Sequence, residues 1–528
     1  MRIRVSLGKG LLIALVFSLI PFSAISAQKI TPGSSCKVYK EKVGYKNKIY
    51  TCIKSGKKFV WGKGVTVVYQ SPVAPTAKAS TKPVATLIPE AGVACETIGT
   101  QHSNSAGYLE CREIAEGRRK YFQLSNNPVP PPMTDSPESL ETCRAPDART
   151  EKNPGVQAIA YPVTSALYPP AIPGIGKIKV AIIPIDFSDV PGTGSPSDLI
   201  DPEIVRINDW VKQFSNGKMT YEIQTSKKWI RAAKESSEYV WVHPGPVQKN
   251  PLAGAKIGAL REPSQIAQDL MASAQGDFDY TNMKIVLFVY PKNIVNIWDA
   301  MTAFGGGIQT NKGIVNAQIN ATGAWLYQNR MPMWSWFIHE NMHPHGLAGH
   351  APSDGSPLNL MTNQDGLSLV LNAWDQLILD WQIPNQFYCV SLNNLKKTEV
   401  MLSPLERNEA GTKAIMVRLS SHEVLVIESR RRDTWSNGYP EYKGLPKGFY
   451  GLVVYKVDTS INRNRVQTGG FADFVKNTKV NHANFFTENT PNFDLNWMIY
   501  EGETLSTNGI SISLTKSGDN DLVTFSRN

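Results

Sequence analysis

The chain has 528 residues, which is more than a single ordinary domain contains, and a formal net charge of +10. Hydrophobic residues make up 41% of it and charged residues 19%, so extensive disorder is excluded. The apolar stretch that comes nearest to the length of a membrane span lies at the N-terminus, and an integral membrane protein is therefore not expected.

Residues 1–27 have the pattern of a secretory signal peptide. Arg2, Arg4 and Lys9 form a positively charged N-terminal region, and residues 11–22 form an apolar core. Small residues up to Ala27 offer a cleavage site. The alternative is an anchor that stays in the membrane, but the apolar core is shorter than the roughly 20 residues that a spanning helix needs. We therefore expect an exported protein, secreted freely or associated with the cell surface.

Residues 28–65 form a strongly basic segment. They contain ten Lys and one Glu, which is a net charge of +9, whereas the chain after them is close to neutral. The high isoelectric point therefore gives no support for nucleic-acid binding by the whole protein. In an exported protein the segment favours an anionic partner, such as an acidic cell-envelope polymer. The alternative is a solvated, soluble face without a partner.

Six cysteines predict disulfides, since an even number in an exported chain is typical of a disulfide framework. Cys36 and Cys52 are sixteen positions apart, as are Cys95 and Cys111, and a glycine, two basic residues and aromatic residues follow each pair. This spacing indicates a weak repeat of a small β-hairpin module, over 28–65 and 91–124, which is too small to be stable without a disulfide. By elimination Cys143 pairs with Cys389. Zinc binding by cysteines is the minor alternative, because no C-x-x-C pair occurs.

Two irregular stretches flank the second module. Residues 66–90 are rich in Pro, Ala, Thr and Ser and predict an extended linker. Residues 125–175 contain many prolines and predict either a second linker or a segment that wraps the next domain. A removable pro-segment is a further alternative.

Residues 176–390 have the pattern of an α/β domain. The predicted strands are 177–187, 284–290 and 313–320, the last as an edge strand. Two helices are predicted to begin at Asp201-Pro202 and at Ser264, and a third covers 333–343. Helical patterns end near residue 390. Residues 391–528 predict a β-sandwich-like domain with strands at 424–428, 451–458, 510–515 and 522–526.

Four of the eight histidines lie within twelve residues at the end of the last predicted helix: His339, His343, His345 and His350. His339 and His343 are four positions apart, so they project from one helix face and can share one Zn²⁺. Glu340 lies beside them and can act as the general base for a metal-activated water. The alternative is a histidine-rich surface helix without a metal.

These residues resemble the zincin metallopeptidases, whose longer motif is H-E-x-x-H-x-x-G-x-x-H/D. The third ligand of that motif falls on Gly349, whereas His350 is one residue later. We expect a one-residue bulge that lets His350 bind the metal, with Asp354 and His345 as alternatives. Pro344 also departs from the motif and predicts a distortion of the helix directly after His343.

Shorter segments resemble, in the same order, the immune inhibitor A-like secreted peptidases over roughly residues 177–528. They are residues 185–191, 214–218, 359–361, 371–375, 428–430 and 451–455. Met361 matches the methionine turn beneath the metal, and the alternative is an ordinary core methionine. The resemblance implies a zincin-like α/β (α+β) catalytic domain over 176–390 with zinc as its cofactor. Calcium would fit such a family, but no D-x-D-x-D-G loop occurs. No tyrosine follows Met361 to serve as a transition-state donor.

The sequence thus predicts a secreted zinc endopeptidase that acts on proteins or peptides and has no nucleic-acid partner. The first alternative is a non-catalytic adhesion or binding protein of the cell envelope on a zincin-like scaffold. Glu340 argues against it, because a metal-binding relic needs no base. A polysaccharide-active enzyme is the second alternative, and no paired carboxylates support it.

Overall fold

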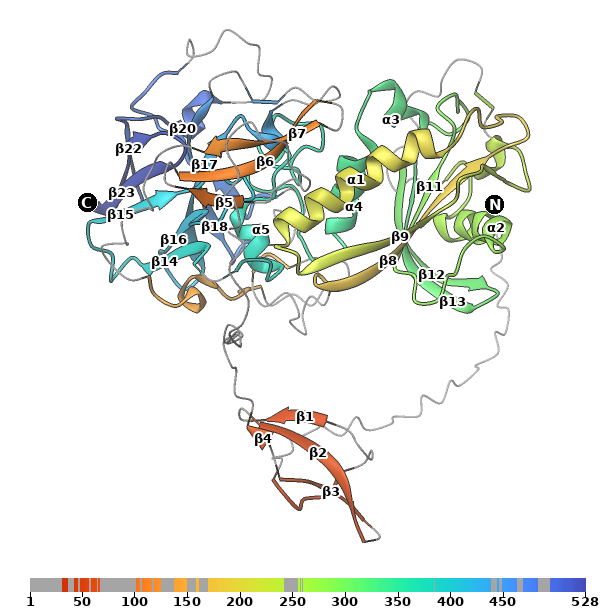
Figure 1. The fold of residues 1–528 in the computed structure, drawn as a ribbon, viewed down its shortest axis with the longest axis horizontal. Helices are drawn as coiled ribbons and strands as arrows, with labels where there is room; N and C mark the ends of the chain where they lie inside the picture. The colour runs from red at the N-terminus through yellow and green to blue at the C-terminus, as the bar shows by residue number, and fades with distance from the viewer. Residues whose placement is uncertain are drawn as a thin grey trace, which may run out of the picture. The chain divides into compact units, whose positions relative to one another are not determined.

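In the computed structural model the chain forms two compact units, Met1–Leu87 and Ile88–Asn528 (Figure 1). The structure describes residues 31–36, 42–45, 48–56, 58–63, 65–66, 101–104, 107–115, 118–124, 137–149, 158–160, 170–241, 255–256, 258, 260–383, 385–437, 444–445, 449–462, 469–482 and 494–528. None of the helices in these ranges is long and apolar enough to cross a membrane. The predicted signal peptide, nearly all of the 66–90 linker and Cys95 lie outside the described residues.

The first unit contains a small antiparallel sheet. Its strands are β1 (Lys42–Tyr45), β2 (Lys48–Ser55), β3 (Lys58–Trp61) and β4 (Val65–Thr66), in the order β1-β2-β3 with β4 also paired to β2. The predicted Cys36–Cys52 disulfide is present. Besides the cysteines, only Tyr50 and Trp61 form its core among the described residues, so the disulfide replaces packing that so short a segment cannot supply.

The second unit begins with a three-stranded antiparallel sheet of β5 (Gln101–Asn104), β6 (Gly107–Ala115) and β7 (Arg118–Leu124). Its backbone register supports the repeat inferred from the cysteine spacing. Cys52 lies opposite Trp61, and Cys111 lies opposite Tyr121. The second hairpin is one residue longer between these positions, and a register shift between Glu113 and Ala115 accommodates that residue.

A six-stranded sheet forms the centre of the α/β domain in the second unit. Its strands are β8 (Gly176–Asp186), β9 (Met219–Thr225), β10 (Ile230–Arg231), β11 (Ile285–Val289), β12 (Met301–Thr310) and β13 (Gly313–Ala321). The order is β10-β8-β11-β13-β12, and β9 also pairs with β8. All of these pairs are parallel except β12 with β13.

Helices cover both faces of this sheet (Figure 1). Alternate strand residues separate into two cores, because successive side chains in a strand point to opposite faces. On β8, Ile182 packs in the core that contains α1 (Ser197–Phe214) and α4 (Met333–Met342), whereas Ile183 packs in the core that contains α2 (Pro263–Ala274). The remaining helices are α3 (Ala324–Gln328), α5 (Ala373–Ile378) and the short 3₁₀ turns η1 (Leu140–Cys143), η2 (Ser236–Tyr239), η3 (Thr434–Ser436) and η4 (Leu495–Trp497).

Three sequence predictions for this domain were wrong in detail. The strand at 313–320 is not at the edge, because β12 pairs beyond it. The first helix begins at Ser197 rather than at Asp201, which places Pro202 inside it and adds the buried Ile200 to its apolar face. The second helix is capped by Glu262 in a capping box with Gln265, not by Ser264.

The C-terminal region, residues 387–528, consists of two packed sheets. The first has the order β14-β16-β17-β18-β19 with β20 on β18, and the second has the order β15-β23-β22-β21. The strands are β14 (Phe387–Ser391), β15 (Thr398–Leu402), β16 (Ala414–Arg418), β17 (Glu423–Arg431), β18 (Tyr450–Asp458), β19 (Ala472–Phe474), β20 (Met498–Ile499), β21 (Thr504–Thr507), β22 (Ile510–Ser517) and β23 (Asp521–Arg527). One apolar core lies between the sheets, so the expected sheet-rich C-terminal region is confirmed.

The other face of the first C-terminal sheet packs against the α/β domain. Met416 and Tyr455 belong to the same buried cluster as Phe337 of α4 and Trp374 of α5. The Cys143–Cys389 disulfide, also predicted, joins the segment before β8 to β14. The two halves of the second unit therefore share one core and one covalent link.

Candidate metal centre

Helix α4 is a core helix that carries two of the histidines. Every residue of Met333–Met342 except Glu340 is buried, as expected for a helix that is apolar on all sides. The regular helix ends at Met342, with His343 as its C-cap, and Pro344 follows directly. The regular helix thus ends one residue before the point at which the sequence predicted a distortion. The chain then turns at Gly346, whose φ of 118° lies in the region that favours glycine.

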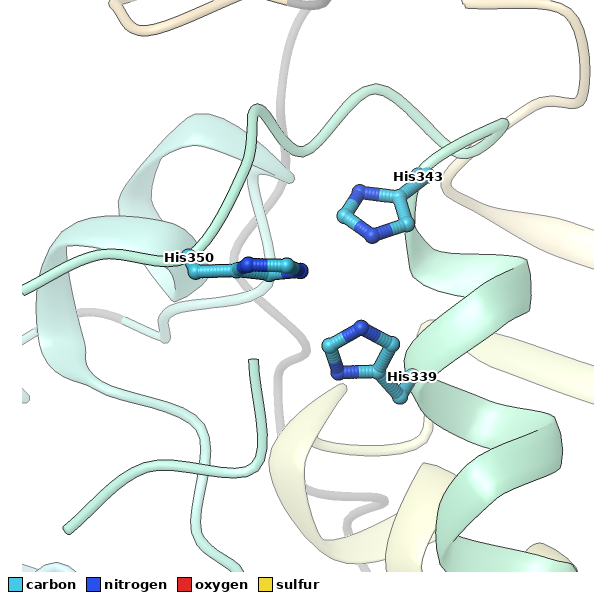
Figure 2. A group of neighbouring side chains, drawn as sticks. All are labelled: His339, His343 and His350. Carbon is cyan, nitrogen blue, oxygen red and sulfur yellow. The ribbon is translucent and has the colours of Figure 1, made fainter. Parts of the chain in front are cut away.

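The structure brings His339, His343 and His350 together (Figure 2). The imidazole rings point toward one another, and one potential ligand atom from each lies within 4.8 Å of the others. Their ring centroids are 5.1 to 6.0 Å apart. His339 is buried, and His343 and His350 are partly buried. These three side chains could hold a metal ion.

The hydrogen bonds of the three rings leave the same nitrogen available on each. Nδ1 of His339 donates to the carbonyl oxygen of Leu360 at 3.0 Å, and Nδ1 of His343 donates to that of Leu347 at 3.2 Å. A carbonyl oxygen only accepts, so Nδ1 carries the proton and Nε2 keeps a free lone pair. His350 Nδ1 lies 3.2 Å from a carboxylate oxygen of Asp354. Such partners orient histidine ligands in metal sites.

Burial also keeps the two helix histidines in the form that binds metals. It lowers the pKa of both His339 and His343 to about 4. Each imidazole is therefore neutral at neutral pH, and no proton has to leave before a metal binds.

Glu340 lies on the same helix turn with its side chain partly exposed. Burial raises the pKa of its carboxyl group, and the neighbouring His343 and His350 and a hydrogen bond with Trp336 oppose this shift. A carboxylate with increased proton affinity beside a metal site is suited to accept and return a proton.

The two alternative third ligands have other partners. His345 is buried outside the group, where its Nδ1 donates to Pro173 O at 2.7 Å and its Nε2 accepts from the Tyr221 hydroxyl at 2.9 Å. Asp354 contacts His350 instead of joining the group. A tight turn in which Ala351 N–H donates to Gly349 O at 3.0 Å accommodates the additional residue before His350.

The predicted methionine turn contacts the group through its backbone. Asn359 Oδ1 accepts from Met361 N–H at 3.2 Å, and Asn359 O accepts from Thr362 N–H, so that residues 359–362 form a compact turn. The carbonyl that binds His339 belongs to Leu360 in this turn. Met361 itself is fully buried.

Sequence reasoning missed the backbone carbonyl partners of His339 and His343, and the carboxylate partner of His350. Asp354 follows His350 by four positions, and this spacing could have predicted the carboxylate partner. A backbone carbonyl partner gives no signal in the sequence. Comparison with known proteins adds no further guide, because no protein-family model matches the chain and no curated protein matches it in sequence.

Proposed function

We propose that this protein is an exported zinc-dependent endopeptidase with a zincin-like catalytic domain. One observation carries the proposal: three histidines from a single helix and the loop after it converge beside a glutamate of that helix. Three protein ligands with a remaining open position are typical of catalytic zinc sites, whereas structural zinc sites use four. The structure supplies three such ligands, His339, His343 and His350.

The ligand set fits zinc on two grounds. Imidazole nitrogens are zinc ligands of the preferred kind, and each Nδ1 has an acceptor that fixes the ring. When bound, zinc would polarise the substrate carbonyl and acidify water at the open position. Imidazole also suits copper, nickel and iron, so the resemblance to the zincins and the Glu340 base are what favour zinc.

The residues of the chain divide the remaining work. His339, His343 and His350 hold the ion, with the first two fixed by carbonyls of the surrounding loops. Glu340 takes the proton of the attacking water and passes it to the leaving amine. Burial raises the pKa of Glu340, which increases its affinity for that proton.

Export agrees with the disulfides at Cys36–Cys52 and Cys143–Cys389, since such bonds persist in oxidising compartments. The competing proposal is a binding protein of the cell envelope that retains the metal and has lost the activity. The three metal ligands would serve such a binding protein equally well, so a cleavage assay decides between the two proposals.

Metal content and proteolysis of the purified protein test the proposal together. We expect a single zinc per chain, casein hydrolysis that stops when a chelator is added, and recovery when zinc is returned. His343→Ala should lose both zinc and cleavage. Zinc without cleavage by wild type would favour the binding protein, and the absence of any bound transition metal would refute the proposed site.

A further inference from the structure

We propose that the C-terminal region completes the metal centre, and that Gly469 is the positioning residue that fixes the loop of His350. This proposal rests on the proposed function, because it concerns how His350, the third ligand of that metal site, is held in place. His339 and His343 are fixed by helix α4, but His350 lies on the loop that follows, one position beyond the zincin motif. Some other part of the structure must therefore determine where His350 lies.

Strand β19, at one end of the first C-terminal sheet, contacts this loop directly. Ser353 N–H donates to Ala472 O at 2.8 Å, and Phe474 N–H donates to Ser353 Oγ at 3.0 Å. Both partners belong to β19, which pairs with β18. The loop that carries His350 is thus attached to the sheet by hydrogen bonds on both sides of Asp473.

Gly469 packs against the peptide bond between His350 and Ala351. It is buried and has a φ of +75°. A Cβ atom at this position would overlap the carbonyl carbon and oxygen of His350 and would lie 2.9 Å from Ala351 N. The obstacle is backbone, not a flexible side chain, so the ligand loop itself would have to move. Glycine is what allows the two backbones to approach this closely.

The same peptide segment is held by side chains as well. Ala351 O accepts from Asn359 Nδ2 at 2.8 Å and from Asn372 Nδ2 at 3.4 Å. The turn that contains Asn359 is in turn bound by the C-terminal region, because Arg430 of β17 donates to Leu358 O at 2.6 Å. The position of His350 therefore depends on the C-terminal region through Gly469 and β19 and through the turn at Asn359.

Gly469→Ala tests this dependence, with Gly509→Ala as a matched control. Gly509 has nearly the same φ, +74°, but a Cβ there would meet no described atom within 4 Å. Both variants thus place alanine at a similar positive φ, and only Gly469→Ala displaces His350. The measurements on full-length protein are zinc affinity by competition with a chelator, the visible absorption of the Co²⁺-substituted protein, which reports coordination geometry, and thermal unfolding without metal.

We expect Gly509→Ala to bind zinc like wild type. Gly469→Ala should unfold at a lower temperature than the control but remain folded under the assay conditions, bind zinc about 10–100-fold more weakly, and give a Co²⁺ spectrum like that of His350→Ala. Equal zinc affinity and equal Co²⁺ spectra of the two glycine variants would overturn the inference and leave the proposed function intact. A wild-type protein that binds no zinc would instead refute the proposed function.

Ser353→Ala provides a second test if Gly469→Ala does not fold. It removes the oxygen that accepts from Phe474 N–H and keeps all of the metal ligands. We expect zinc affinity to fall by about tenfold, the lower end of the range for residues that support ligands. Wild-type zinc affinity together with a wild-type Co²⁺ spectrum would again overturn the inference.

Discussion

Removal of the Cys143–Cys389 disulfide should strongly destabilise the second unit. The two cysteines are 246 positions apart, and the loop between them contains the central sheet and the helix that carries His339. In the chain-entropy model a cross-link stabilises by restricting the unfolded chain, with a loss of unfolded-state entropy that grows with the logarithm of loop length. For a loop of this length the model gives about 5.5 kcal/mol at 25 °C. Because the free energy of unfolding of a typical protein is only about 5–15 kcal/mol, the loss of this cross-link would remove a large fraction of it.

The test is the double variant Cys143→Ala/Cys389→Ala, followed by urea unfolding with tryptophan fluorescence as the signal. Trp374 and Trp381 are buried in the second unit and report its unfolding. The control is Cys36→Ala/Cys52→Ala, which opens a loop of 16 residues in the first unit and should leave this transition in place. A loss below about 1 kcal/mol in the second unit would refute the loop-length reasoning, since the model demands several times that amount.

Three other predictions concern features other than the metal ligands. Burial raises the pKa of Asp375 from 3.8 to about 8, so between these values the unfolded chain releases a proton that the folded protein keeps, and stability falls as the pH rises. Asn at this position cannot ionise, so the stability of Asp375→Asn relative to wild type should rise between pH 4 and pH 8 by up to about 1.4 kcal/mol per pH unit. Urea unfolding of both proteins measures this difference, and a stability difference that does not change with pH would contradict the raised pKa. Deletion of residues 28–65 should abolish salt-sensitive binding to cell walls, because contacts of their +9 charge are screened at 1 M salt, where the Debye length is about 3 Å. Equal retention of the full-length and deleted proteins at low salt would rule out the anionic partner. Mass mapping of the non-reduced protein should find a peptide that links Cys95 to Cys111, and free thiols there would end the repeat argument.

The parts of the fold that the sequence predicted are those with strong local signals. The unbroken apolar run Ile285–Val289 forms a strand buried on both faces, as such runs do in parallel sheets. The four-residue spacing of His339 and His343 fixes their common helix face whatever surrounds them. The equal spacing of cysteine pairs likewise needs no knowledge of the fold.

The features that were missed depend on contacts between distant segments or on weak local propensity. Strand β12 contains Gly305, Gly306 and Gly307, which lower strand propensity, and it forms because β13 lies beside it. A proline is typical of the first turn of a helix, but α1 begins five residues before Pro202, at Ser197, and the additional turn buries Ile200. The approach of Gly469 to His350 joins segments far apart in the chain, and the sequence around either residue contains no sign of the other.

Casein hydrolysis by zinc-loaded Glu340→Ala, compared with wild type, tests the central claim most directly. Glu340 is not one of the three converging side chains, so the variant should retain zinc and the native fold. Because general-base action contributes about 10²–10⁴-fold, turnover should fall by that factor. If Glu340→Ala holds zinc and cleaves casein as fast as wild type, this site is not that of a peptidase.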